Sequence, residues 1–359
     1  MFGSIYLKLV KRLEMGKKKR VITRNFKDLK VRRKLSKEQK KEVQDFYMGL
    51  IGRKVDLYSH EYFYSRTGIF AKEYVPTNLY HCDLLPRANK HNLKPAYNDK
   101  NLTDILFQGE NVAHTVLKNM NGYYYSEGRP VSEEEAVSLC RNMENMIIKP
   151  SKKSKGMGIH LLSVKDGVTN IDGLTVGALF KKYSPNFQIQ KVVRQHKDMA
   201  ALNPTSVNTI RILSYRSGME VLIIYSVVRI GRKGSEIDNQ SAGGISTTIS
   251  KDGKLGKEAF GGYSEDNIVR TDTGIVLEGY QLPSYDRAIE FVKRLHYRLP
   301  FFDLVGWDIA IEEDGSPILI EFNTEVGLSQ SAFGSGFGEY TERVIRELWK
   351  KPNSWFKDC

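Results

Sequence analysis

The residues best suited to chemistry in this sequence are three oxygen-bearing side chains near its end, Asp308, Glu321 and Asn323. They lie in two short apolar runs with period-2 alternation, joined by an Asp314-Gly315 turn typical of a β-hairpin. Glu321 and Asn323 are two residues apart and leave the same strand face, and a hairpin can bring Asp308 beside them. Such oxygens suit a hard cation such as Mg²⁺. The alternative is an ordinary solvated face of an antiparallel hairpin.

A second polar segment follows an apolar strand that ends at Lys149. Residues 151–158 read SKKSKGMG and lead into another apolar strand over 159–164. Lysine charges, backbone amides and flexible glycines together are typical of a loop that covers phosphate groups. The order of a P-loop is absent, and no helix follows immediately. A plain basic hairpin is the alternative.

Length and composition indicate a globular protein of two or three domains, with 359 residues of which 40% are apolar. The three cysteines, Cys82, Cys140 and Cys359, are scattered without metal-ligand spacing, which fits a reducing cytoplasm. No apolar run approaches the ~18 residues that span a bilayer, and no signal-peptide pattern is present. We therefore expect a cytoplasmic protein.

The positive charge is concentrated at the N-terminus. Residues 1–41 hold 16 lysines and arginines against 3 acidic residues, which accounts for the whole net charge of +13. Residues 1–13 can form a short helix with apolar residues on one side, so the segment predicts peripheral contact with the inner face of an anionic membrane. No nucleic-acid reader motif accompanies the charge, and no nucleic acid is expected. A solvated or partner-binding arm is the alternative.

The remaining pattern favours α+β layers. Antiparallel pairs are expected at 116–120 with 123–125 and at 208–215 with 221–230. Ser132 and Glu135 predict a capped helix that runs to Met146. Further helices are expected at 284–299 and 340–350.

Several of these segments together resemble the ATP-grasp superfamily of ATP-dependent ligases. IIKPSKKSKGMGIHLL resembles its strand-lysine and glycine-rich lid, FQIQKVV its adenine hinge, and GWDIAI followed by ILIEFNTEVG its magnesium motif. QHKDMAALNPTSVNTIRIL, the upstream NDKN and the loop from Asp238 to Gly244 most resemble the sugar-transfer-associated branch, which is related to α-L-glutamate-ligase-like proteins. The resemblance covers roughly residues 75–350.

The resemblance implies an ATP-grasp fold, in which two α+β subdomains clasp ATP. A small N-terminal α/β region and a basic helical arm would precede them. The expected divisions are the arm at 1–41, a mixed α/β domain at 42–120, the lid subdomain at 121–195, the catalytic subdomain at 196–350 and a tail at 351–359.

The resemblance also assigns nucleotide contacts. Lys149 would contact the α- and β-phosphates, and Gly156 and Gly158 would close over them. Lys118 or Lys100 would supply a second lysine. The adenine and ribose contacts would come from four residues: Gln190, Lys191, Val193 and Asp198.

The reacting end of the implied site contains the metal ligands and two arginines. Asp308, Glu321 and Asn323 would carry two Mg²⁺ ions, for which Mn²⁺ can substitute. Arg229 would face phosphate, Arg211 would face phosphate or a substrate carboxylate, and Asn239 would lie near the acceptor. One departure from D-alanyl-type ligases is Glu325-Val326 after Asn323-Thr324, where those enzymes usually have an apolar residue and proline.

The activity that the resemblance implies is ATP-dependent joining of a carboxylate to an amine through an acylphosphate, with release of ADP. The sugar-transfer branch suggests sugar-linked substrates in cell-envelope polysaccharide or sugar-conjugate biosynthesis. Two alternatives stay open. One is a phosphotransferase acting on a sugar hydroxyl, and the other is a non-catalytic ATP-grasp module that docks at a membrane glycosyltransferase complex.

Overall fold

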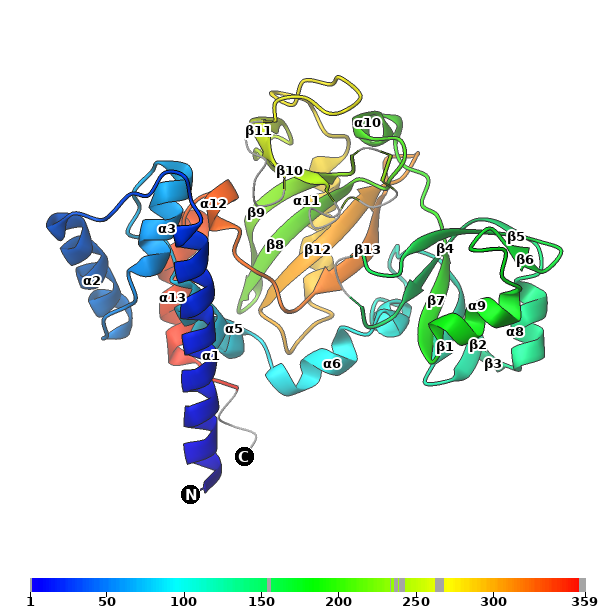
Figure 1. Cartoon of the computed structure of the whole chain (residues 1–359), viewed down its shortest axis with the longest axis horizontal. Helices are drawn as coiled ribbons and strands as arrows, with labels where there is room; N and C mark the ends of the chain where they lie inside the picture. The colour runs from blue at the N-terminus through cyan, green and yellow to red at the C-terminus, as the bar shows by residue number, and fades with distance from the viewer. Residues whose placement is uncertain are drawn as a thin grey trace.

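Two antiparallel β-sheets, each with helices packed against one face, form the chain from Thr115 onward, and helices alone precede them (Figure 1). The computed structural model describes residues 2–153, 156–232, 234–235, 238, 243–261 and 268–354. Its side chains are described except at residues 2–8, 11, 331 and 333. The α+β class expected from the sequence is confirmed.

The first sheet has seven strands in the order β3-β2-β1-β7-β4-β5-β6. The Asn121-Gly122 turn has positive φ at both residues, which suits the two-residue connection between β1 and β2. Helices α8 (Glu133–Leu139) and α9 (Val176–Tyr183) cover one face and close an apolar core. The strands are β1 (Thr115–Met120), β2 (Tyr123–Ser126), β3 (Arg129–Val131), β4 (Met143–Pro150), β5 (His160–Lys165), β6 (Val168–Thr169) and β7 (Asn186–Lys191).

The second sheet has six strands in the order β11-β10-β9-β8-β12-β13. Helix α11 (Tyr285–His296) packs its apolar side against this sheet, while α10 (Lys197–Leu202) precedes β8. Every residue of β12 is buried. The strands are β8 (Thr209–Ser217), β9 (Glu220–Ile230), β10 (Ile245–Ile249), β11 (Leu255–Phe260), β12 (Leu304–Ile311) and β13 (Pro317–Asn323).

The N-terminal part is helical, and the C-terminal helix α13 (Thr341–Lys350) returns to pack beside it (Figure 1). A Ser36 capping box begins the second helix, and Gly52 in the left-handed region ends it. The helical elements before the first strand are α1 (Phe2–Lys27), α2 (Lys37–Ile51), α3 (Tyr58–Thr67), α4 (Thr77–Leu79), η1 (Tyr80–Leu84), α5 (Leu85–Ala88), η2 (His91–Leu93), α6 (Lys94–Tyr97), η3 (Lys100–Leu102) and α7 (Thr103–Leu106). Two short elements, α12 (Gln330–Phe333) and η5 (Gly338–Tyr340), precede α13.

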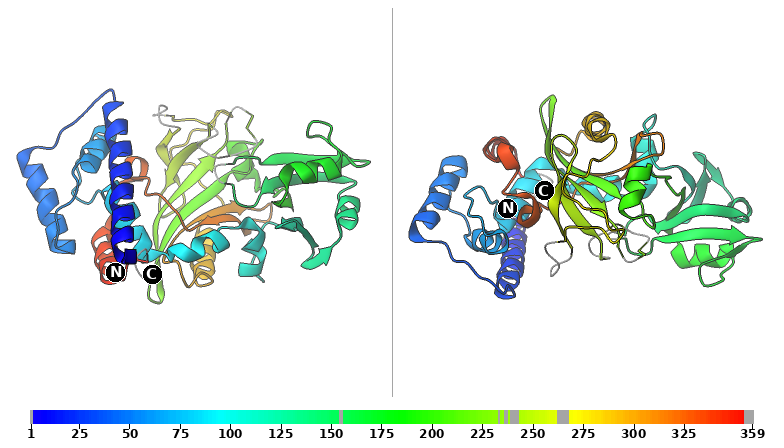
Figure 2. Two further views of the ribbon diagram at one scale, coloured as in Figure 1. Left: turned by 60° about the horizontal axis from the view of Figure 1, so that its bottom comes forward. Right: turned by 90° about the horizontal axis from the view of Figure 1, so that it is seen from above.

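Helix α1 is anchored at one end only. Ile22 and Phe26 are buried, whereas Leu9 and Leu13 are 56% and 54% exposed. In Figure 1 the N-terminal half of α1 extends away from the rest of the molecule, and Figure 2 shows the N-terminal helices at the opposite end of the molecule from the seven-stranded sheet. None of the helices in the described part of the chain is long and apolar enough to cross a membrane.

Most expected elements are present, with two changes of length. The hairpins β1–β2 and β8–β9 and the Ser132 capping box are confirmed. The predicted helix from Ser132 stops at Leu139 because β4 begins at Met143 and pairs with strands on both sides. The N-terminal helix is longer than predicted and continues through Gly16 to Lys27.

Candidate functional site

A cavity of about 670 Å³ lies between the two sheets, where β4 and the loop after it face the second sheet. The polar side chains that line it come from both sheets and from the helical segment around α6 and η3. These residues are Asn98, Lys100, Lys149, Lys152, Lys153, Thr209, Arg211, Tyr225, Arg229, Asp238, Ser246, Asp308, Glu321, Asn323, Glu325 and Ser329.

One row of the cavity floor crosses three neighbouring strands. Asp308 of β12 pairs in register with Arg211 of β8 on one side and with Glu321 of β13 on the other. Residues opposite one another in antiparallel strands project on the same face. The predicted hairpin therefore places Asp308 and Glu321 together in the cavity.

The adjacent row contains Gly306, which pairs with Leu213 on one side and Asn323 on the other. A Cβ atom at Gly306 would lie 2.6 Å from Val326 Cγ1. The absence of a side chain at Gly306 therefore allows the loop after β13 to pack closely over β12. This close approach keeps Asn323 and Val326 at the same cavity wall.

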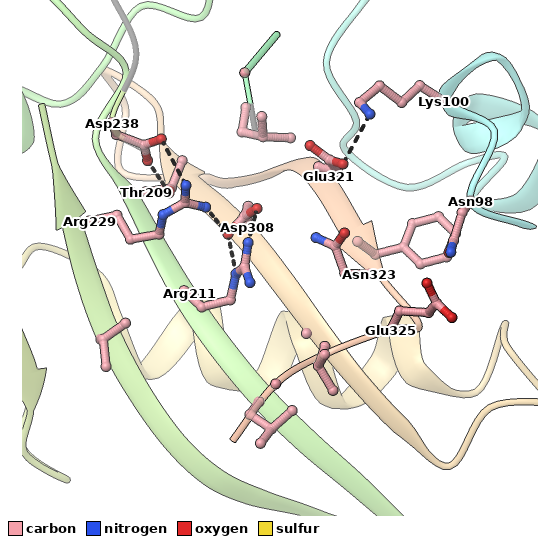
Figure 3. Close-up of a pocket in the computed structure, with 18 of the residues that line it drawn as sticks. Asn98, Lys100, Thr209, Arg211, Arg229, Asp238, Asp308, Glu321, Asn323 and Glu325 are labelled. Atoms are coloured by element: carbon pink, nitrogen blue, oxygen red, sulfur yellow. Dashed lines mark hydrogen bonds and ion pairs between the residues drawn. The ribbon is translucent and has the colours of Figure 1, made fainter. Parts of the chain in front are cut away.

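The Asp308 carboxylate is held by two arginines (Figure 3). Arg211 donates to both oxygens, from Nε at 2.5 Å and from Nη2 at 2.7 Å, and Arg229 Nη1 donates at 3.1 Å. Burial opposes ionisation of Asp308, but the two guanidinium groups outweigh it and hold its pKa below the usual value. Asp308 is consequently a permanent anion at neutral pH.

Asp238 is the second acid beside Arg229, and its environment acts in the opposite direction. Its carboxylate lies 3.5 Å from Arg229 Nη2 and accepts a hydrogen bond from the Thr209 hydroxyl. Burial raises the pKa of Asp238, although Arg229 opposes the rise. The two acids that flank Arg229 thus have pKa values moved apart by their surroundings.

Two lysines face the Glu321 side of the cavity. Lys100 Nζ lies 3.1 Å from Glu321 Oε1 and also donates to the Lys153 carbonyl at 2.8 Å. Lys149 is the last residue but one of β4 and its side chain is buried. Burial lowers its pKa to about 8 despite the opposing charge of Glu321. A depressed pKa beside a cavity marks Lys149 as a candidate functional group.

The donor set of this floor fits a hard divalent cation. Asp308, Glu321 and Asn323 present carboxylate and amide oxygens to one cavity, and Mg²⁺ prefers a few such oxygens together with phosphate and water. Within the described residues there is no group of three or more His, Cys, Asp and Glu side chains placed to hold a metal alone.

The glycine-rich loop lies at the cavity edge. Gly156 and Gly158 both have φ of 74°, which is the left-handed region that favours glycine. Gly156 lines the cavity. Gly158 instead packs near Pro150, where an added Cβ would come within 3.0 Å of the ring.

The structure brings together seven of the predicted site residues as lining of one cavity: Lys149, Gly156, Arg211, Arg229, Asp308, Glu321 and Asn323. Of the two candidate second lysines, Lys100 lines the cavity. The Lys118 amino group is 2.5 Å from Asp104 Oδ1, and Lys118 is outside the described lining.

The predicted adenine and ribose residues also lie outside that lining. Gln190 directs its amide group to the Ala113 carbonyl at 3.2 Å and to Thr115 Oγ1 at 2.9 Å. Its backbone pairs with Ile147, which does line the cavity. Lys191 is the last residue of β7, and Val193 lies in the segment that follows this strand. Asp198 is in the first turn of α10. Asn239 lies outside the described residues.

Sequence reasoning missed several wall residues that period-2 alternation could have found. Thr209 and Leu213 flank Arg211 at two-residue spacing on β8, and Tyr225 and Val227 precede Arg229 in the same way on β9. Once one residue of a strand faces the cavity, its neighbours at i±2 do so as well. Ser246 had no comparable signal, whereas Lys152 belongs to the lysine- and glycine-rich segment already predicted to cover phosphate.

One protein-family model matches most of this chain. A family model described as sugar-transfer associated ATP-grasp matches residues 80–345, which is well over half of the chain. No curated protein matches the sequence.

Solved structures that match include three enzymes. Phosphoribosylamine–glycine ligase from Thermotoga maritima has 12% identity and a TM-score of 0.45, with 72% of this chain and 57% of that chain covered. Biotin carboxylase from Campylobacter jejuni has 12% identity and a TM-score of 0.43, with 73% and 47% covered. L-amino acid ligase from Bacillus licheniformis has 12% identity and a TM-score of 0.41, with 72% and 49% covered. This chain thus spans about half the length of these structures.

The Asp308 carboxylate predicts a measurable loss of stability when it is neutralised. We expect Asp308→Asn to lower the free energy of unfolding by about 3 kcal/mol, because the mostly buried Arg211 loses its anion and Arg229 keeps only Asp238. Asp45→Asn, at an exposed ion pair, should change it by less than about 0.5 kcal/mol. Urea unfolding measures both, and equal effects would contradict the role given to Asp308.

Proposed function

Since the chain belongs to the sugar-transfer associated ATP-grasp family, we propose that it is an ATP-dependent carboxylate–amine ligase. Its two sheets form the α+β ATP-grasp fold that was expected. The observation that carries the proposal is one cavity in which Asp308, Glu321 and Asn323 of the second sheet face Lys149 of the first. This arrangement combines oxygen donors for a metal with a cation for phosphate. The substrates proposed from the family description are sugar-linked, in cell-envelope polysaccharide or sugar-conjugate biosynthesis.

The phosphates of ATP would lie between Lys149 and Lys100 on one side and the carboxylate floor on the other. Both lysines line the cavity, and Lys100 Nζ lies 3.1 Å from Glu321 Oε1. Asp308, Glu321 and Asn323 would hold two Mg²⁺ ions, which Mn²⁺ can replace. Bound metal would neutralise the charge of the phosphate oxygens. The adenine would lie along residues 190–193, with Asp198 toward the ribose.

The proposed reaction has two steps. A substrate carboxylate oxygen attacks the γ-phosphorus of ATP, the bond to the bridging oxygen breaks, and ADP leaves with that oxygen. The amine then attacks the acyl carbon of the acylphosphate, inorganic phosphate leaves, and the amine nitrogen loses a proton. Arg211 and Arg229 would stabilise the charge on the transferring oxygens. Little side-chain acid–base chemistry is required.

Neutralising Glu321 tests the assignment. We expect Glu321→Gln to lower ATP turnover by about 100-fold or more. The substitution removes a carboxylate that would bind the metal and that pairs with Lys100. Glu313→Gln, an exposed substitution in the turn of the same hairpin, is the matched control and should keep full turnover. The assay uses Mg·ATP, a panel of amino acids and uronic acids, and hydroxylamine as a general nucleophile. Retained turnover in a folded Glu321→Gln protein would refute the metal assignment.

The products of this assay separate the proposed ligase from the alternatives. A ligase releases ADP and inorganic phosphate and forms a hydroxamate. A phosphotransferase would release ADP with a phosphorylated sugar and no hydroxamate. A non-catalytic module would bind Mg·ATP, by calorimetry, without substrate-dependent ADP release.

The pKa of Lys149 predicts a pH dependence of ATP binding. The lysine is protonated below its pKa of about 8 and loses its charge as the pH rises through that value. We expect the affinity for Mg·ATP to fall by about eightfold between roughly pH 7.5 and 9, as one proton is linked to binding. Lys149→Met should bind more weakly and lose this dependence. Equal pH profiles for both proteins would contradict a phosphate contact by Lys149.

We also propose that helix α1 contacts the inner face of an anionic membrane. Leu9 and Leu13 are exposed one turn apart, and basic residues follow them along the helix. Changing both leucines to serine should weaken binding to vesicles containing anionic lipid by about tenfold, since apolar area is lost. Met219→Ser, at a residue that is 86% exposed elsewhere, should have no effect. Sedimentation at low and high salt measures binding. Unchanged partitioning would leave α1 as a solvated arm.

A further inference from the structure

The loop after β13 adds a further acidic side chain beyond the proposed metal ligands. Glu321, Asn323 and Glu325 follow one another at two-residue spacing, and all three line the cavity. In Figure 3, Glu325 lies on the side of Asn98 and Asn323, away from the Arg229 and Asp238 end. The family resemblance gave no role to an acid at this position, where D-alanyl-type ligases usually have an apolar residue.

The cation beside Glu325 is Lys94, a buried residue of α6. Lys94 Nζ lies 3.2 Å from Glu325 Oε1, and the exposed fractions of the two side chains are 6% and 62%. The lysine is thus enclosed by protein, whereas the carboxylate extends into the open space.

The neighbouring histidines add no positive charge at neutral pH. Burial and the charges of Lys18 and Lys94 lower the pKa of His81 to about 4. The pKa of His91 is also lowered, by burial and by Lys94. Among the residues that contact Glu325, Lys94 is therefore the cation that balances its charge.

The backbone that presents Glu325 is fixed from several directions. The Thr324 hydroxyl donates to Asn98 Oδ1 at 2.8 Å, and the Tyr80 hydroxyl donates to the Val326 carbonyl at 2.7 Å. The Tyr225 hydroxyl donates to the Gly327 carbonyl at 3.2 Å. A carboxylate on so constrained a segment is positioned before any ligand arrives.

We propose that Glu325 binds the amine substrate as an ammonium ion. This inference rests on the proposed ligase function. Lys149, Lys100, Asp308, Glu321 and Asn323 are occupied by ATP and metal in that proposal, and Glu325 is the accessible carboxylate of the described lining that has no such task.

The charge balance also defines the class of amine. Because Lys94 already neutralises Glu325, a second cation of high charge is disfavoured there. An amino acid in its zwitterionic form adds no net charge, and a primary amine adds a single positive charge. The ammonium group has three N–H donors for hydrogen bonds to carboxylate oxygens. One of these protons passes to Glu325 or to solvent before the nitrogen lone pair attacks the acyl carbon.

The inference is tested by amine binding to Glu325→Gln. Saturation-transfer NMR would measure the binding of five amines, with Mg²⁺ and a non-hydrolysable ATP analogue present: glycine, L-alanine, L-glutamate, ethanolamine and glucosamine. We expect at least one of these amines to bind the wild type and Glu313→Gln equally, and Glu325→Gln at least tenfold more weakly. The affinity for the nucleotide should be unchanged in all three proteins. No amine binding by the wild type, or equal binding by Glu325→Gln, would overturn the inference.

Two further measurements show whether a loss of amine binding comes from misfolding, and whether the amine site fails separately from the ligase proposal. Lys94→Met with Glu325→Gln removes both charges, so no buried lysine is left unpaired, and it should show the same loss of amine binding. The amine titration is repeated without nucleotide. Loss of amine binding in Glu325→Gln, alongside a wild type that does not bind Mg·ATP, would support the amine site and refute the ligase.

Discussion

The ion pair between Arg211 and Asp308 is the interaction on which the rest of the site depends. It joins the adjacent strands β8 and β12 through two charge-assisted hydrogen bonds on the cavity face. The strand register then places Glu321 directly across from Asp308. An anion buried at this position is tolerated only because two guanidinium groups accompany it. The same guanidinium groups bring positive charge to the place where phosphate oxygens would lie.

The opposite face of β12 fixes the orientation of that carboxylate. Trp307 is fully buried, and its indole Nε1 donates to the Ser214 hydroxyl at 2.8 Å. His296 lies 2.8 Å from the same hydroxyl, and burial lowers its pKa to about 4, so it stays neutral in the core. Since adjacent residues in a strand project to opposite faces, anchoring Trp307 in the core turns Asp308 into the cavity.

Local chemistry made much of this site predictable from the sequence. The alternation around Asp308 and Glu321 and the turn at Gly315 indicated the hairpin, and the lysine–glycine segment indicated the facing loop. The contacts of Lys100 and Lys94 were not predictable, because they join a short helical segment to β13 more than 200 residues later. No local periodicity encodes such a pairing. The choice between Lys100 and Lys118 could be addressed only once packing had placed Lys118 beside Asp104.

The helical N-terminal part is joined to the end of the cavity where Glu325 lies. Helix α1 packs on α3 and α4 and also contacts η1. From η1, Tyr80 reaches the Val326 carbonyl in the segment that presents Glu325. The charge of Lys18 on α1 also acts on His81, beside Tyr80. Element η1 therefore connects α1 to the segment that presents Glu325. A surface bound by α1 would consequently lie nearer to the Glu325 end of the site than to the seven-stranded sheet (Figure 1).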